Sequence, residues 1–163
     1  MTTFRHPRLA QRQRGVVLVV ALIFLLLVTL IGVSSMQNAT MQEKMAGSVS
    51  IKNQSFQIAE ASLRLGENAV AATAYTLTKC TPAANCLPPP DSTSASLAAG
   101  VGTNGVTWVA TTNGFYGVQN LGTTADAVNA PANCSNSATL YRVTGVGIYG
   151  ISRSVVESIY AKC

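Results

Sequence analysis

The stretch that decides the fold runs from Arg14 to Val33 and reads RGVVLVVALIFLLLVTLIGV. Its last eighteen residues carry no charge, and a helix of that length spans about 27 Å, close to one hydrocarbon core. Thr29 and Gly32 are the interruptions in the apolar run, and a membrane helix tolerates both. The stretch therefore predicts a helix that crosses a membrane once.

The segment before this helix is basic. It contains four arginines and no acidic residue, namely Arg5, Arg8, Arg12 and Arg14. Because the basic flank of a membrane helix stays in the cytoplasm, we expect the N-terminus there and the rest of the chain on the other side. Seven basic and six acidic residues follow position 15, so the body of the chain is nearly neutral. This distribution argues against nucleic acid as a partner.

Three interpretations of the first residues fit the pattern. One is an ordinary membrane anchor with a basic flank. The second is a secretory signal cut near Ser34 and Ser35, although the apolar run is longer than the usual hydrophobic region of such signals. The third is a leader of residues 1–15 that is cut at the Gly15–Val16 junction and leaves the apolar helix on the mature chain. Periodicity does not choose between them.

Three blocks of the sequence are informative in their particular residues as well as in their periodicity. They are residues 13–37, Met41–Gly47 and Ser55–Arg64. Together they resemble the start of a PilX-type minor pilin of the type IV pilus. The likeness covers about residues 12–70. A weaker likeness appears near the C-terminus, in Tyr141-Arg-Val-Thr-Gly145 and Ser154-Val-Val-Glu-Ser-Ile-Tyr160.

The resemblance implies a set of functional positions. A prepilin peptidase would cut after Gly15 and methylate the new amine of Val16. Most pilins carry glutamate at the fifth mature position, and Val20 occupies that position here. Glu43 follows the apolar run within a matched block and is a candidate contact to a neighbouring subunit. The alternative for Glu43 is a solvated surface acid.

A helical pattern continues beyond the apolar run. Spacings of 4, 7, 3, 4 and 7 residues place six apolar side chains on one helical face: Met45, Val49, Phe56, Ala59, Leu63 and Val70. We expect this face to pack on the protein's own sheet and the helix to end near residue 76. Gly47, with serines beside it, predicts a bend or a frayed turn.

The remainder predicts a loop region over residues 77–104 and a β-sheet over residues 105–163. Pro88–Pro90 ends regular structure within the loop. Residues 105–111 alternate as a strand does, and residues 112–136 predict loop with one short strand near Tyr116–Gln119.

The clearest β signal is a hairpin. Residues 139–147 and 152–160 alternate on either side of Tyr149-Gly150-Ile151. Val143, Val155 and Ile159 are the residues expected to point inward. Trp108 is expected in the core rather than in a binding site.

Four cysteines follow the apolar run, at Cys80, Cys86, Cys134 and Cys163. An even number on the exported side indicates two disulfides. Three pairings are open, and we favour Cys80–Cys86 with Cys134–Cys163. The second bridge closes a loop that contributes about 3–4 kcal/mol in the chain-entropy model.

Patterns for catalysis, a metal or a cofactor are missing from the sequence. The one histidine, His6, lies in the leader, and no CxxC pair suggests zinc. Glu43, Glu60 and Glu67 are too far apart on a helix to form a carboxylate pair. Gly145-Val-Gly147 lies in a strand pattern with no following helix, so it is not a phosphate loop. We therefore expect a protein that is not an enzyme.

The predicted architecture is α+β and pilin-like. It has a leader of residues 1–15, a transmembrane half-helix of residues 16–33, and a periplasmic or extracellular domain of residues 34–163. The resemblance implies a structural minor pilin that helps to prime assembly at or near the pilus tip and supports adhesion or twitching motility. It would sit first in the inner membrane and later in the extracellular pilus.

The partners implied by the resemblance are the major pilin and other minor pilins, which would contact the N-terminal helix. A PilY-type tip adhesin and the prepilin peptidase complete this set. Two alternatives stay open. One is a tip pseudopilin of type II secretion, and the other is a membrane-anchored binding module that never joins a fibre.

Overall fold

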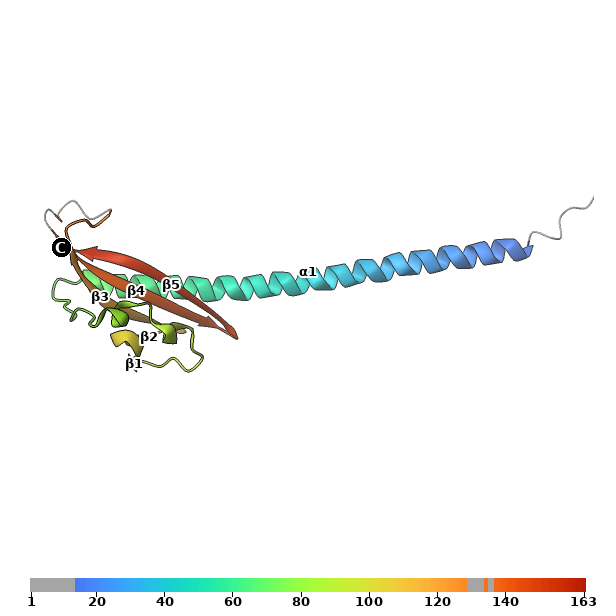
Figure 1. The fold of residues 1–163 in the computed structure, drawn as a ribbon. Coiled ribbons are helices and arrows are strands. Elements are labelled where there is room, and N and C mark those ends of the chain that lie inside the picture. The colour runs from blue at the N-terminus through green and yellow to red at the C-terminus, as the bar shows by residue number, and fades with distance from the viewer. Residues whose placement is uncertain (1–13, 129–133, 135–136) are drawn as a thin grey trace, which may run out of the picture. The chain divides into compact units, whose positions relative to one another are not determined.

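The computed structural model describes residues 14–128, 134 and 137–163 (Figure 1). By contacts, the chain divides into two compact units, Met1–Gly47 and Ser48–Cys163. The helix α1 (Arg14–Ala71) begins in the first unit and ends in the second. Within the described residues, three short 3-10 turns and five strands follow it. They are η1 (Ala83–Cys86), η2 (Pro90–Thr93), β1 (Gly100–Val101), η3 (Thr103–Gly105), β2 (Thr107–Thr111), β3 (Gly114–Thr124), β4 (Ala138–Tyr149) and β5 (Ser152–Lys162).

The strands form one antiparallel sheet in the order β1-β2-β3-β4-β5. Strands β3, β4 and β5 lie along the C-terminal part of α1, which belongs to the same unit (Figure 1). A long apolar N-terminal helix with an antiparallel sheet packed on its second half confirms the predicted α+β, pilin-like arrangement. The helix passes through Gly47 without a break, so the expected frayed turn is absent.

Small side chains make the contact between α1 and the sheet. Ser55, Ala59, Ser62, Gly66 and Val70 are the buried positions of this part of α1, and their spacing of four, three, four and four residues keeps them on one face. They replace part of the predicted apolar face, because Met45, Val49 and Phe56 are exposed. The prediction followed hydrophobicity, whereas this face is selected for small size.

Glycines on β4 match the small residues of the helix. A Cβ at Gly147 would collide with the backbone of Ser55 and Ala59, and one at Gly145 would lie 2.7 Å from the backbone nitrogen of Leu63. The helix backbone therefore rests directly on β4 at these two glycines. No larger residue fits there unless the helix moves away.

Hydroxyl groups fasten the same contact. Ser55 Oγ lies 2.8 Å from Ser154 Oγ, and Ser62 Oγ lies 2.7 Å from Thr111 Oγ1. Ser158 Oγ donates to Glu67 Oε1 over 2.6 Å. These bonds satisfy polar groups that the close packing would otherwise bury without partners.

The helix ends at Ala71, several residues before the predicted end. Lys162 on β5 donates through Nζ to the carbonyl oxygens of Ala72 and Tyr75, over 2.6 and 3.1 Å. A cation at this position complements the carbonyl groups that a helix C-terminus leaves unpaired. The chain then turns, and Tyr75 and Leu77 pack against the core.

Each face of the sheet carries its own apolar cluster. On the helix face, Val70, Val118, Tyr141 and Val143 are buried together. The second cluster contains Val106, Trp108 and Val146, and the loop region between α1 and β2 contributes Leu97 to it. Trp108 is 2% exposed, so the expectation of a core residue is confirmed.

Hydrogen bonds to one aspartate, Asp91, connect the loop region to Trp108, and we call this group of bonds the Asp91 clasp. Asp91 Oδ2 accepts hydrogen bonds from Thr103 N over 2.9 Å and from Trp108 Nε1 over 3.1 Å. Its Oδ1 accepts from Thr103 Oγ1 over 2.9 Å. Burial by itself raises the pKa of Asp91, but these hydrogen bonds outweigh it, so the pKa lies below its usual value.

The predicted hairpin is confirmed in β4 and β5, which are joined at Gly150 and Ile151. One inward assignment is wrong. Val143 is fully buried and Val155 packs on the Trp108 cluster, but Ile159 is 53% exposed. Ile159 pairs with Arg142, and this end of the sheet face has polar neighbours instead of an apolar cover.

The short strand predicted near Tyr116–Gln119 is present, but it is longer than predicted, so the loop predicted around it is wrong in the first half of residues 112–136. Strand β3 takes up Gly114–Thr124 and pairs with both β2 and β4. Its glycines were interpreted as loop signals, but a Cβ at Gly117 would strike Val106 and Trp108. They are packing requirements of a central strand. Residues 129–133, 135 and 136 of this prediction lie outside the described residues. Strand β1 likewise lies inside the predicted loop of residues 77–104.

The structure pairs Cys80 with Cys86 and Cys134 with Cys163, with Cα atoms 5.3 Å apart in each pair. This is the pairing that the sequence favours. The buried Gln119 and the half-buried Arg142 hold the first bridge to the sheet. Gln119 Nε2 donates to the carbonyls of Asn85, Leu87 and Asn104, and Arg142 Nη1 donates to the carbonyl of Cys86.

The close approach of helix and sheet predicts the effect of a single methyl group. Gly147→Ala should lower the free energy of unfolding by roughly 1–3 kcal/mol, because the new Cβ displaces the backbone of α1. Thermal unfolding of the full chain in detergent, followed by Trp108 fluorescence, measures this loss. Gly47→Ala is the matched control, since its Cβ meets nothing within 4 Å and alanine favours the helix. Equal stability of the two variants would contradict the packing.

The Asp91 clasp predicts a pH dependence. A carboxyl whose pKa is lowered by folding stabilises the protein above its unfolded pKa of about 4, and this stabilisation disappears as pH falls through the folded pKa. Asp91→Asn should therefore lower the melting temperature at pH 7 and have a shrinking effect below about pH 4. Asp126→Asn serves as the control on an exposed acid. A loss for Asp91→Asn that stays constant between pH 7 and pH 3 would contradict the clasp.

Candidate assembly interface

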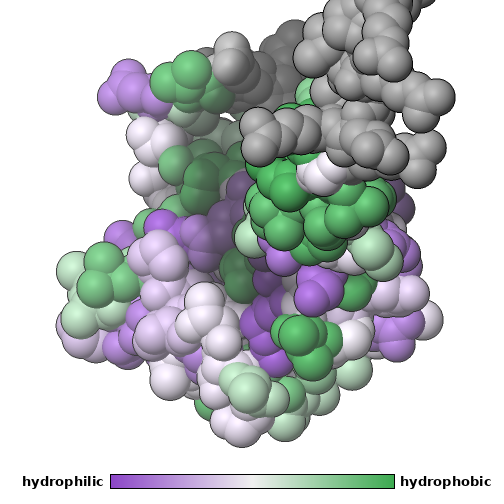
Figure 2. Space-filling model, turned by 90° about the vertical axis from the view of Figure 1, so that its right-hand side faces the viewer, coloured by the Kyte–Doolittle hydropathy of each residue, from purple (hydrophilic) through white to green (hydrophobic). Residues whose placement is uncertain are grey.

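The N-terminal part of α1 exposes an uninterrupted apolar surface. Every residue from Gly15 to Ser50 is exposed, and the first eighteen after Gly15 carry no charge. Within the described residues, α1 is long and apolar enough to cross a membrane. Hydrophobic residues gather where α1 points toward the viewer in Figure 2. A surface of this kind in water would be strongly unfavourable, so lipid or protein must cover it.

The positions expected at the start of the mature chain lie in the first turns of this helix. Gly15 follows the first residue of α1. Val16 is 65% exposed and Val20 is 44% exposed, and their spacing of four residues places them one turn apart on one face. The leader residues 1–13 lie outside the described residues. In the described part of the chain, the side chains of Val16 and Val20 are therefore exposed on the helix surface.

Glu43 is exposed on the same helix. In the described part of the chain, the ion pair within 4.0 Å joins Arg142 and Glu157 on the sheet, and Glu43 takes no part in it. The structure thus leaves the Glu43 carboxylate available to a neighbouring molecule.

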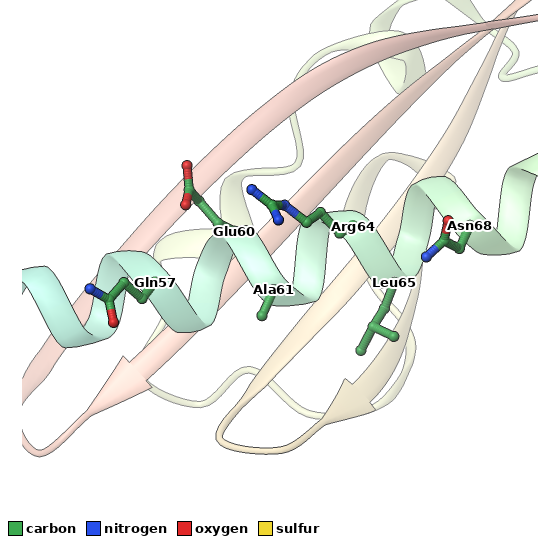
Figure 3. A pocket seen from close by; sticks show the side chains of 6 residues that line it. All are labelled: Gln57, Glu60, Ala61, Arg64, Leu65 and Asn68. Carbon is green, nitrogen blue, oxygen red and sulfur yellow. The ribbon is translucent and has the colours of Figure 1, made fainter.

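A second exposed surface lies on the face of α1 opposite the sheet contact. It forms a shallow hollow of about 400 Å³ along the helix. In Figure 3, Glu60 and Arg64 point to one side of it, and Ala61 and Leu65 point to the other. The lining residues are Gln57, Glu60, Ala61, Arg64, Leu65 and Asn68. Leu65 is 51% exposed, and apolar and charged groups alternate here without a titratable cluster.

The polar and cysteine side chains described in the second unit have structural contacts. Among the described residues, no group of three histidine, cysteine, aspartate or glutamate side chains could hold a metal ion. All four cysteines are in disulfides. The buried Gln119 and the half-buried Arg142 hold loop carbonyls in place, so they act in folding.

The sequence reasoning missed the tip of the β4–β5 hairpin as a surface feature. It treated Tyr149-Gly150-Ile151 as a turn, but Ile151 is 103% exposed and Tyr149 is 41% exposed. Tight turns favour glycine, asparagine, aspartate, proline and serine. An isoleucine at such a position is the sequence signal that could have indicated a contact surface.

Comparison with known proteins gives one match, and it falls on the helix. Residues 14–64 match the family described as PilX N-terminal. This range contains the apolar run and the buried face of α1 as far as Ser62. The family is one of structural pilins. No curated protein and no solved structure matches the chain at a significant level.

The PilX N-terminal match and the observed fold are consistent with each other. The family covers the part of the chain that forms the apolar helix, and the remaining residues add the antiparallel sheet on its second half. Both features are those of a membrane-anchored pilin that associates with other pilus components. The match of residues 14–64 to the PilX N-terminal family therefore supports a PilX-type type IV pilin.

Proposed function

We propose that this protein is a minor pilin that occupies the tip of a type IV pilus and helps to start its assembly. The observation that carries the proposal is the exposed, uncharged helix of residues 16–33, which lies inside the PilX N-terminal match. Such a helix has two suitable environments. Lipid covers it before assembly, and the helices of other pilins cover it within the fibre.

Packing between helices of this kind depends on shape, because lipid tails are as apolar as the helices themselves. A Cβ added at Gly32 would meet nothing within 4 Å in the described structure, and because Gly32 itself has no side chain, another helix can approach its backbone closely. This access to the helix supports a structural role in which α1 provides the assembly surface.

Processing would prepare the helix for this role. A prepilin peptidase that cuts after Gly15 removes the four leader arginines, and methylation follows at the new amine of Val16. The mature chain then begins with the apolar run. Its N-terminal amine is its one charge before Glu43, which makes the pairing of that amine important in a dry fibre core.

Val20 supports the position at the tip. In pilins generally, the glutamate at this position neutralises the N-terminal amine of the adjacent subunit. A buried charge without a partner costs several kcal/mol, so this pairing favours recruitment beneath an existing subunit. Val20 cannot accept a hydrogen bond from an amine. A subunit with nothing above it has no use for the contact, while its own Val16 amine can still attract the glutamate of the next subunit.

A position at the tip fits the other proposed partners. Other minor pilins and the major pilin would contact α1, and Glu43 is available for one of these contacts. The surface of the sheet would remain accessible to a PilY-type adhesin. Adhesion and twitching motility would then depend on this chain through the number of pili that it helps to start.

The Val20 argument predicts the distribution of the protein along the fibre. Immunogold labelling of purified pili should place the wild-type chain at one end. Val20→Glu should raise the number of copies per pilus severalfold and spread the label inward, because the new carboxylate can pair with an amine. Val19→Glu is the matched control, since it adds the same charge on a different face of the helix.

Two results would contradict this proposal. Label along the whole shaft for the wild-type chain would remove the position at the tip. Inward spreading for Val19→Glu as well as for Val20→Glu would show that any added carboxylate has the same effect, and the pairing at the fifth mature position would then explain nothing.

A further inference from the structure

The tip of the β4–β5 hairpin carries an apolar side chain that the fold does not use. Ile151 is 103% exposed, so it contributes no burial to the second unit. The turn itself depends on Gly150, whose φ of +56° lies in the left-handed region. Any polar residue would serve the turn at position 151 as well as isoleucine does. The isoleucine therefore points to a contact outside the chain.

This side chain forms one wall of a small apolar hollow, which we call the hairpin notch. Ile51 and Lys52 on α1 form the facing wall, and the hollow measures about 290 Å³. The residues that line the hairpin notch are Ser48, Ile51, Lys52, Ile151 and Ser152. All five belong to the second unit.

Hydrogen bonds hold the two walls together. Lys52 Nζ donates to the carbonyl oxygen of Arg153 over 2.8 Å, and Ser55 Oγ lies 3.1 Å from Ser152 Oγ. These contacts connect α1 directly to the first residues of β5. The notch is therefore formed before any partner arrives, which lowers the ordering cost of binding.

The charges of the notch indicate the chemistry of its partner. No acidic residue lines it, and its one cation, Lys52, is turned to a backbone carbonyl. An anionic lipid surface needs free cations, which the notch does not supply. An uncharged and apolar partner meets no unpaired charge there. Residues 16–33 of this chain show which pilin segment has that composition.

We propose that the hairpin notch receives the apolar N-terminal helix of a neighbouring pilin subunit. The inference rests on the proposed function, because it needs a fibre in which such helices lie beside one another. It adds a specific contact on the second unit to the packing of the apolar helices. Ile151 is the residue that makes this contact, with Ile51 beside it.

Photocrosslinking in cells that assemble pili tests this contact with the full chain. A photoreactive phenylalanine at position 151 should crosslink to a peptide from the apolar N-terminal helix of a pilin. The same probe at Val101, which is 89% exposed on β1, is the control and should not reach that helix. Crosslinks from position 151 to lipid, to another part of a pilin, or at the level of the Val101 probe would overturn the proposal.

Substitution gives an independent readout. Ile151→Asp should reduce the amount of the chain in sheared pili at least fivefold, whereas Val101→Asp should leave it within twofold of wild type. The membrane level and both disulfides should be normal in each variant, and Ile151→Ser should show a smaller loss. If wild-type chain is missing from pili, the proposed function itself is wrong. If wild type is present and Ile151→Asp enters equally well, this inference alone is wrong.

Discussion

The packing of the second unit depends on the direct contact between the α1 backbone and the β4 backbone. Gly145 and Gly147 leave no space between strand and helix, and Ser55 and Ala59 approach from the other side. Side-chain hydroxyls then satisfy the polar groups that this approach buries. Because backbone meets backbone at these two glycines, a shift of either backbone would disturb the packing of the sheet.

This contact also explains how one helix meets two requirements. In residues 16–33, large apolar side chains cover the whole circumference, as suits lipid or a bundle of similar helices. In residues 55–70, one narrow face is small and buried, and the opposite face is mixed and exposed. A single helix can therefore present an assembly surface in one part and carry a sheet in the other. The PilX N-terminal match spans both parts.

The sequence predicted features that depend on strong local patterns. The uncharged run from Val16 to Val33 and the alternating strands on either side of Gly150 needed no knowledge of tertiary contacts. The helix face was predicted less well, because Ser55 and Ser62 are buried for their size and hydroxyl groups rather than for hydrophobicity. The extent of strand β3 was underestimated for a similar reason, since Gly114 and Gly117 look like loop residues until the neighbouring side chains are known.

The candidate interface was likewise only partly predicted from the sequence. Gly15, Val16 and Val20 were identified from the resemblance, while the exposed Ile151 needed the structure. The most direct measurement of the pilin assignment is the mass of the N-terminal peptide of this chain, recovered from purified pili. The account predicts a chain that begins at Val16 and carries one added methyl group. A chain that begins near Met36, or one that retains Met1, would contradict it.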